Sequence, residues 1–150
     1  MNIDWLHLKQ LSKMKTPEDI NEFEKKIWTL AQTKNINVLT HLIDLFDDNC
    51  LYYEVMYSLV HAIETYNKND YVNAVIKKIH DGIKNYKFWI DCLCNRIFND
   101  LSYLAIFRQN MHLADKESLL KLFKIMEEES PHHRQLIQEL RKEIETSSKD

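Results

Sequence analysis

Glycine is almost absent from this sequence, and its scarcity limits the possible folds more than any other feature. The 150 residues include one glycine, Gly82, and two prolines, Pro17 and Pro131. The tight turns of β-hairpins depend on glycine and on Asn-Gly pairs, because their central residues adopt positive φ. Helices joined by short polar turns have no such requirement. The sequence therefore predicts an all-α protein.

Apolar residues recur along nearly the whole chain at the i, i+3, i+4, i+7 spacing of amphipathic helices. Thr16-Pro17 and Ser130-Pro131 each combine an N-cap hydroxyl with a proline suited to the first helical turn, and Asp115 is a further N-cap candidate. Nine helices are expected, at about 3–14, 17–33, 38–46, 54–66, 71–82, 88–98, 101–111, 116–129 and 131–145.

Length and composition indicate one cytoplasmic domain over residues 1–150, with a frayed tail at 146–150. The sequence has no run of 18 apolar residues that would suggest a membrane span. Its first residues lack the pattern of a signal peptide. Cys50, Cys92 and Cys94 have no spacing typical of a disulfide framework. A net charge of −3 argues against direct nucleic-acid binding. No motif calls for a cofactor or a metal.

A weak internal repeat of 33 residues relates the middle helices. Two helices in each 30–40 residues are typical of helical-hairpin solenoids. We therefore expect stacked helical hairpins in a right-handed curve like that of HEAT or armadillo proteins, although any two amphipathic helices overlay once they are in phase. The shift places Val38, Leu39, Leu42, Ile43 and Phe46 onto Tyr71, Val72, Val75, Ile76 and Ile79, and Val55, Met56, Leu59 and Val60 onto Phe88, Trp89, Cys92 and Leu93.

The middle of the chain is acidic and rich in tyrosine. From Asn35 to Asn67 there are five acids and no lysine or arginine. Tyrosine is common at protein interfaces, and carboxylates steer the approach of a basic partner. The run is therefore interpreted as a contact surface for a basic protein, often a nuclease, although many acidic clusters are only solvated faces. The expected contact residues are Asp44, Asp47, Asp48, Tyr52, Tyr53, Glu54 and Tyr57.

Catalytic chemistry finds little support in the sequence. His61 and Glu64 have the spacing of two metal ligands on a helix, but no second such motif accompanies them. Ser58 precedes His61 by three residues on the same predicted helix, and no third group is placed to orient the histidine. An ion pair between Glu64 and Arg96 would join neighbouring helix pairs and be partly buried; Arg96 could instead bind a ligand. We expect a protein that is not an enzyme.

The residues of this central region resemble those of the immunity protein 30 family. The resemblance spans residues 38–105 and is most specific in the order Glu, Ser, His, Glu followed by Arg-Ile. Phe88 stands where the family usually has an acid, and Phe98 where it has leucine. The matching segments are Glu54–Tyr66, Tyr71-Val72, Trp89 and Arg96–Asn99.

Several expectations follow from this resemblance. It implies an all-helical, cytoplasmic antidote that binds a cognate bacterial toxin domain, including toxins of contact-dependent growth inhibition, many of which are nucleases such as RNases. The residues that carry the resemblance are expected to hold the fold: Ser58, His61, Glu64, Trp89, Arg96 and Asn99. Two alternatives stay open, a helical-repeat scaffold without a toxin partner and a metal-dependent enzyme built on His61 and Glu64.

Overall fold

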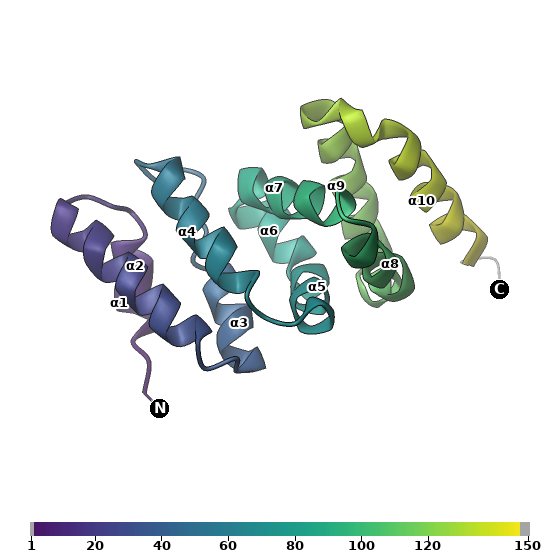
Figure 1. The fold of residues 1–150 in the computed structure, drawn as a ribbon. Helices are drawn as coiled ribbons and strands as arrows, with labels where there is room; N and C mark the ends of the chain where they lie inside the picture. Colours follow the sequence, from purple (N-terminus) through teal and green to yellow (C-terminus); the bar gives the residue numbers. More distant parts are fainter. Residues whose placement is uncertain (1, 148–150) are drawn as a thin grey trace. The chain divides into compact units, whose positions relative to one another are not determined.

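The computed structural model describes residues 2–147 and contains only helices and their connections in that range (Figure 1). The predicted all-α class is confirmed. Ten α-helices and two short 3-10 helices lie in the described part of the chain: α1 Trp5–Leu11, α2 Pro17–Ala31, α3 Ile36–Ile43, α4 Tyr53–Ile63, α5 Lys68–Lys77, α6 Ile79–Asn85, α7 Lys87–Phe98, α8 Leu101–Asn110, η1 Met111–Leu113, α9 Lys116–Glu129, η2 Pro131–His133 and α10 Arg134–Ser147.

The chain divides into two compact units, with the boundary after Ala74 inside α5. The N-terminal unit holds α1 to α4 and most of α5, and the C-terminal unit holds α6 to α10. The prediction of one domain, and of a right-handed HEAT-like curve through the whole chain, stays a prediction.

In the N-terminal unit, α2 packs against α1, α3 and α4. Its start is fixed as the sequence predicts, because the Thr16 side chain accepts a hydrogen bond from the Asp19 backbone N–H at 3.1 Å. The apolar stripe of α2 includes Phe23 and Ile27, both fully buried. The core is completed from α3 and α4 by Leu39, Leu42, Ile43, Met56, Leu59 and Val60.

In the C-terminal unit, α9 packs against α6, α7 and α10. Asp115 caps α9 as expected, accepting from the Ser118 backbone N–H at 3.1 Å. Large aromatic side chains fill the interior, among them the fully buried Trp89, Phe107 and Phe123. Burial of rings of this size supplies much of the apolar area that stabilises a helical unit.

The helix expected at about 71–82 is in fact two helices, α5 and α6, which meet at Lys78. Here the backbone leaves helical geometry, with φ −98° and ψ 6° at Lys78. The second helix carries Gly82, where an added Cβ would lie 2.9 Å from the Cβ of Ile90. The single glycine of the chain therefore permits close packing of α6 on α7.

The ends of the first and last helices also differ from expectation. α1 covers Trp5–Leu11 rather than 3–14, since Asp4 is its N-cap and accepts from the His7 backbone N–H. Residues 146 and 147, expected to fray, continue α10, where the Thr146 hydroxyl donates to the Lys142 carbonyl at 2.8 Å. The rest of the expected tail, 148–150, lies outside the described residues.

Burial follows the 33-residue repeat closely in the first helix of each pair. All ten apolar positions that the shift overlays in those helices, from Val38 to Phe46 and from Tyr71 to Ile79, are buried. In the second helices Met56 and Trp89 are both fully buried. The repeat therefore describes equivalent core positions in two successive helix pairs, the second of which begins before the unit boundary at Ala74.

Candidate functional site

The surface predicted from the acidic, tyrosine-rich run lies in the N-terminal unit. Asp44 is the C-cap of α3, and a loop then leads to Tyr52, the N-cap residue of α4. Tyr52 provides no side-chain cap, and Glu54 lies in the first turn of the helix. The predicted contact residues are therefore contiguous in space as well as in sequence, from the end of α3 to the first half of α4.

The first part of this surface, the loop from Asp44 to Cys50, is tied to α1. The Lys9 ammonium donates to the carbonyls of Asp44 and Phe46, at 3.1 and 3.0 Å, at the C-terminal end of α3. A cation is favourable there because helix carbonyls point outward with a partial negative charge. Desolvation lowers the pKa of Lys9, and the nearby carboxylate of Asp47 opposes that shift.

Asp47 has an internal role that the sequence did not reveal. Its Oδ2 lies 3.6 Å from Lys13 Nζ, and its Oδ1 accepts from the Asn49 backbone N–H at 2.8 Å. The Asp47 side chain is only 13% exposed. The run without lysine or arginine is thus not an isolated acidic surface, because Lys9 of α1 and Lys13 of the turn after α1 face it.

Desolvation also acts on the thiol at the end of this loop. Burial raises the pKa of Cys50 to about 11, and the carboxylates of Asp47 and Asp48 add to the shift. At neutral pH the thiol is therefore protonated, and it lacks the thiolate character of a nucleophile or a metal ligand. Cys50 belongs to the packed interior of the loop.

The second part of the surface is open. We call Leu51, Tyr52, Tyr53 and Glu54 the aromatic edge. Leu51 is 63% exposed, Tyr52 45% and Tyr53 43%, and Glu54 is exposed as well. The Tyr53 hydroxyl donates to the Asp48 carbonyl at 2.9 Å and so orients its ring. The side chains of Tyr52 and Glu54 have no hydrogen-bond or ion-pair partner among residues 2–147.

The other expected contact residues are less accessible. Asp44, Asp48 and Tyr57 are half-buried, and each already interacts with other residues of the protein. Of the seven expected contact residues, Tyr52, Tyr53 and Glu54 therefore offer the most accessible side chains. The candidate site narrows from the whole acidic run to the aromatic edge.

The residues expected to hold the fold divide between the units. In the N-terminal unit the Ser58 hydroxyl donates to Glu24 Oε2 at 2.9 Å, and His61 Nδ1 lies 3.6 Å from Glu64 Oε1. In the C-terminal unit Trp89 is fully buried in α7, and Asn99, the C-cap of that helix, is exposed. Ser58 thus joins α4 to α2, and Trp89 belongs to the core.

Arg96 differs from the partly buried residue expected from the sequence, because it is exposed. Its ion pair with Glu64 stays a prediction, since the two residues belong to different units. An exposed ion pair contributes only about 0.2–1 kcal/mol. The exposed Arg96 would therefore contribute less to such a pair than the partly buried residue that was expected.

The geometry around His61 does not assemble a nucleophile and base. The Ser58 proton is donated to Glu24, whereas His61 Nδ1 faces Glu64. Within residues 2–147 no three His, Cys, Asp or Glu side chains gather as a metal site would require. In the same range no helix has both the length and the apolar character needed to cross a membrane.

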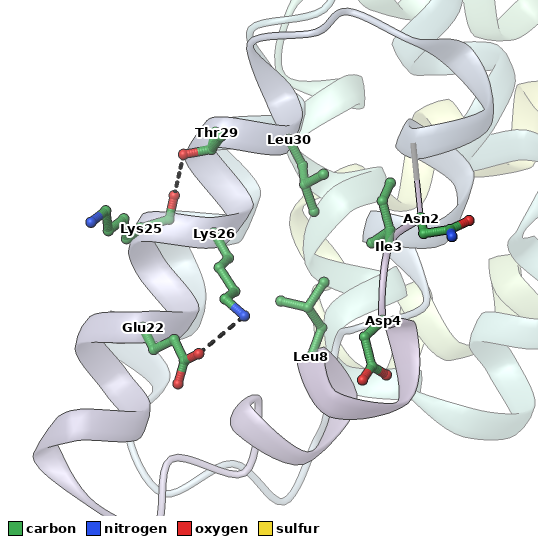
Figure 2. A pocket seen from close by; sticks show the side chains of 9 residues that line it. All are labelled: Asn2, Ile3, Asp4, Leu8, Glu22, Lys25, Lys26, Thr29 and Leu30. Atoms are coloured by element: carbon green, nitrogen blue, oxygen red, sulfur yellow. Dashed lines mark hydrogen bonds and ion pairs between the residues drawn. The ribbon is translucent and has the colours of Figure 1, made fainter.

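A groove in the same unit lies between the N-terminal segment and α2 (Figure 2). It has a volume of about 480 Å³ and an apolar floor of Ile3, Leu8 and Leu30. Lys26 extends into it and pairs with Glu22 at 3.0 Å. The Glu22 carboxylate also lies 3.3 Å from His7 Nε2, and hydrogen bonds with Lys26 and His7 lower its pKa. The Glu22 and Lys26 charges are thus paired, while the Lys25 side chain, which also lines the groove, has no hydrogen-bond or ion-pair partner among residues 2–147.

Sequence reasoning missed two residues on α2 that adjoin the site. Glu24 accepts the Ser58 hydrogen bond, and Trp28 is 37% exposed although tryptophan is usually well buried. A signal for Trp28 was present, because it lies beside the buried stripe of its helix rather than within it. Glu24 had no such signal, since its role depends on a residue 34 positions away.

Comparison with known proteins gives one match. A family model described as Immunity protein 30 matches residues 10–107, about two-thirds of the chain. The match begins within α1, well before the segment that carries the resemblance in the sequence, and it includes α2 and the aromatic edge. Neither the search of curated proteins nor that of solved structures returned a match.

Proposed function

This chain belongs to the immunity protein 30 family, and from that premise we propose that it neutralises a bacterial toxin domain by binding it through the aromatic edge. The observation that carries the proposal is the combination of family membership with an exposed surface of tyrosine and glutamate. Tyrosine gives a large contact area with a polar tip at low cost in conformational entropy, which suits a protein interface.

A basic toxin, such as an RNase or another nuclease, is the partner that the charge favours. Through Ala74 the chain has eleven acids and seven lysines, for a net charge of −4, whereas the remainder has twelve acids and thirteen Lys or Arg, for +1. Enzymes that act on nucleic acids carry basic surfaces for phosphate. An anionic unit would attract such a surface over distances of about 8 Å at physiological salt.

The proposed inhibition is stoichiometric and involves no chemical step by this chain. The toxin would be bound in the cytoplasm, where its target nucleic acid lies. Carboxylates and tyrosines could occupy the phosphate-binding site of the toxin or cover a neighbouring surface. Toxins delivered in contact-dependent growth inhibition are the class that this mode of action fits.

Co-purification tests the proposal directly. The chain is co-expressed with a tagged C-terminal domain of the protein encoded immediately upstream, with catalytic activity of that domain disabled by mutation if necessary. A 1:1 complex that survives gel filtration is expected, and the chain should protect cells from the active domain. If the two proteins elute separately and the chain gives no protection, the proposal is wrong for this pair.

A further inference from the structure

A face shared by α2 and α4 adjoins the aromatic edge. Three contacts fix how the two helices align: Ser58 with Glu24, Thr65 with Lys34, and Tyr66 with Asn35. Their order shows that α2 and α4 run in the same direction, as Figure 1 also shows. Residues one turn beyond Glu24 are therefore level with residues one turn beyond Ser58.

This alignment puts Trp28 level with His61 along the two helices. Trp28 follows Glu24 by four residues, and His61 follows Ser58 by three, so each lies one turn further along its own helix. Trp28 is 37% exposed, and the His61 side chain is 58% exposed. Within the described residues no aromatic ring and no cation lies over the Trp28 ring. Its indole therefore has an accessible surface on this face.

One carboxylate lies close to Trp28 along its own helix, since Glu24 precedes it by one turn on α2. Glu54, in the first turn of α4, lies two turns before His61 and belongs to the aromatic edge. Glu24 accepts from Ser58 but pairs with no lysine or arginine in residues 2–147, and Glu54 has no partner there. In the turn after α2, the Lys34 ammonium donates to the Thr65 hydroxyl and lies over the Tyr66 ring. Glu24 is thus the carboxylate one turn from the exposed indole, while Lys25, three residues before Trp28, lines the groove between the N-terminal segment and α2.

We propose that this face, Glu24 and Trp28 on α2 with Ser58 and His61 on α4, receives an arginine side chain of the toxin. Tryptophan is the best aromatic platform for a cation, and a planar guanidinium stacks on it while it pairs with carboxylates. Tryptophan and tyrosine are also the residues that most often dominate binding energy at interfaces. Trp28 is then the anchor of the contact, and the aromatic edge forms its neighbouring part.

The inference rests on the proposed function, and binding measurements distinguish the failure of one from the failure of the other. The probe is the inactivated C-terminal domain encoded immediately upstream, titrated with the full chain by calorimetry. Trp28→Ala should raise the Kd at least tenfold, whereas Trp28→Phe, which keeps an aromatic surface, should raise it about threefold. Glu24→Gln keeps an acceptor for Ser58 and should weaken the dependence of Kd on salt.

Leu101→Ala is the control, because Leu101 is 85% exposed in the other unit and its removal should leave the Kd unchanged. Circular dichroism shows whether each variant is folded. If Trp28→Ala does not fold, the comparison is made with Trp28→Phe and Glu24→Gln instead. Wild-type affinity in both of these, with weakened binding by Tyr52→Ala, would overturn the role of this face and leave the proposed function in place. A wild-type chain that fails to bind would overturn both.

Discussion

Two neighbouring segments of the N-terminal unit both combine acids with large side chains: the loop from Asp44 to Cys50 and the aromatic edge that follows it. Their environments differ. In the loop, Asp47 is 13% exposed and faces Lys13, and Lys9 caps the end of α3. In the aromatic edge, Tyr52 is 45% exposed and Glu54 has no partner among the described residues.

The difference shows that acids in a sequence do not by themselves make an acidic surface. Lysines more than 30 positions away decide which carboxylates are used to build the unit and which remain for a partner. The loop should therefore affect stability when it is changed, and the aromatic edge should affect binding. Mutations can test whether these two effects are separate.

Removal of the Lys9 ammonium should produce the largest loss of stability. Lys9→Met keeps the length and apolar stem of the side chain but leaves two carbonyls at the end of α3 without their donor. Loss of a partner for part-buried polar groups costs about 1–3 kcal/mol. Urea unfolding should show this decrease while the Kd for the toxin domain stays within about twofold. If the variant were as stable as the wild type, the hydrogen bonds of Lys9 would not stabilise the loop.

A smaller effect is expected from the Lys13–Asp47 pair. Half of Lys13 is exposed, so either Lys13→Met or Asp47→Asn should lower the free energy of unfolding by about 0.2–1 kcal/mol. Asparagine keeps the acceptor for the Asn49 backbone N–H. The double mutant should lose less than the sum of the two single mutants, because the second change removes a partner that is already lost. Additive losses would mean that the two charges act independently.

The smallest effect is a pH dependence in the C-terminal unit, where Asp91 has neutral hydrogen-bond partners instead of lysine. Asn95 Nδ2 donates to its Oδ1 at 3.0 Å, and the Ser130 hydroxyl lies 3.4 Å from its Oδ2. Desolvation raises the pKa of Asp91 above its usual 3.8; the charge of Glu129 acts in the same direction, and His132 opposes it.

Between the usual pKa and the raised one, the native state binds more protons at Asp91 than the unfolded state does. The stability contributed by this group therefore increases as the pH falls through that window and is lost as the pH rises. Wild type should gain stability relative to Asp91→Asn when unfolding is measured from pH 6 down to pH 4. A difference between the two proteins that is independent of pH would contradict the raised pKa.

The fold could be predicted from the sequence because its determinants are local. Scarce glycine, helical periodicity and caps such as Thr16 and Asp115 act within a few residues. The break at Lys78 was missed, because apolar periodicity continues through it from Val75 to Ile79 while the backbone turns. Periodicity reports which residues are buried and not whether the helix axis is continuous.

The site was only partly predictable, for a different physical reason. The acidic run and its tyrosines indicated the correct region, but exposure depends on neighbours that are distant in sequence. Asp47 was expected at the interface and is held by Lys13, while Trp28 of α2 is 37% exposed and was not expected at the site. Such pairings follow from how α1 and α2 pack on later helices, and the sequence of one chain does not contain that information locally.

The most direct test of this separation compares Tyr52→Ala with Asp47→Asn, each measured for both unfolding and toxin binding. Tyr52→Ala should raise the Kd at least tenfold, equivalent to about 1.4 kcal/mol, and leave the free energy of unfolding within about 0.5 kcal/mol of wild type. Asp47→Asn should lower the free energy of unfolding and leave the Kd within about twofold. The opposite pattern, with Asp47 controlling binding and Tyr52 controlling stability, would contradict the division between the loop and the aromatic edge.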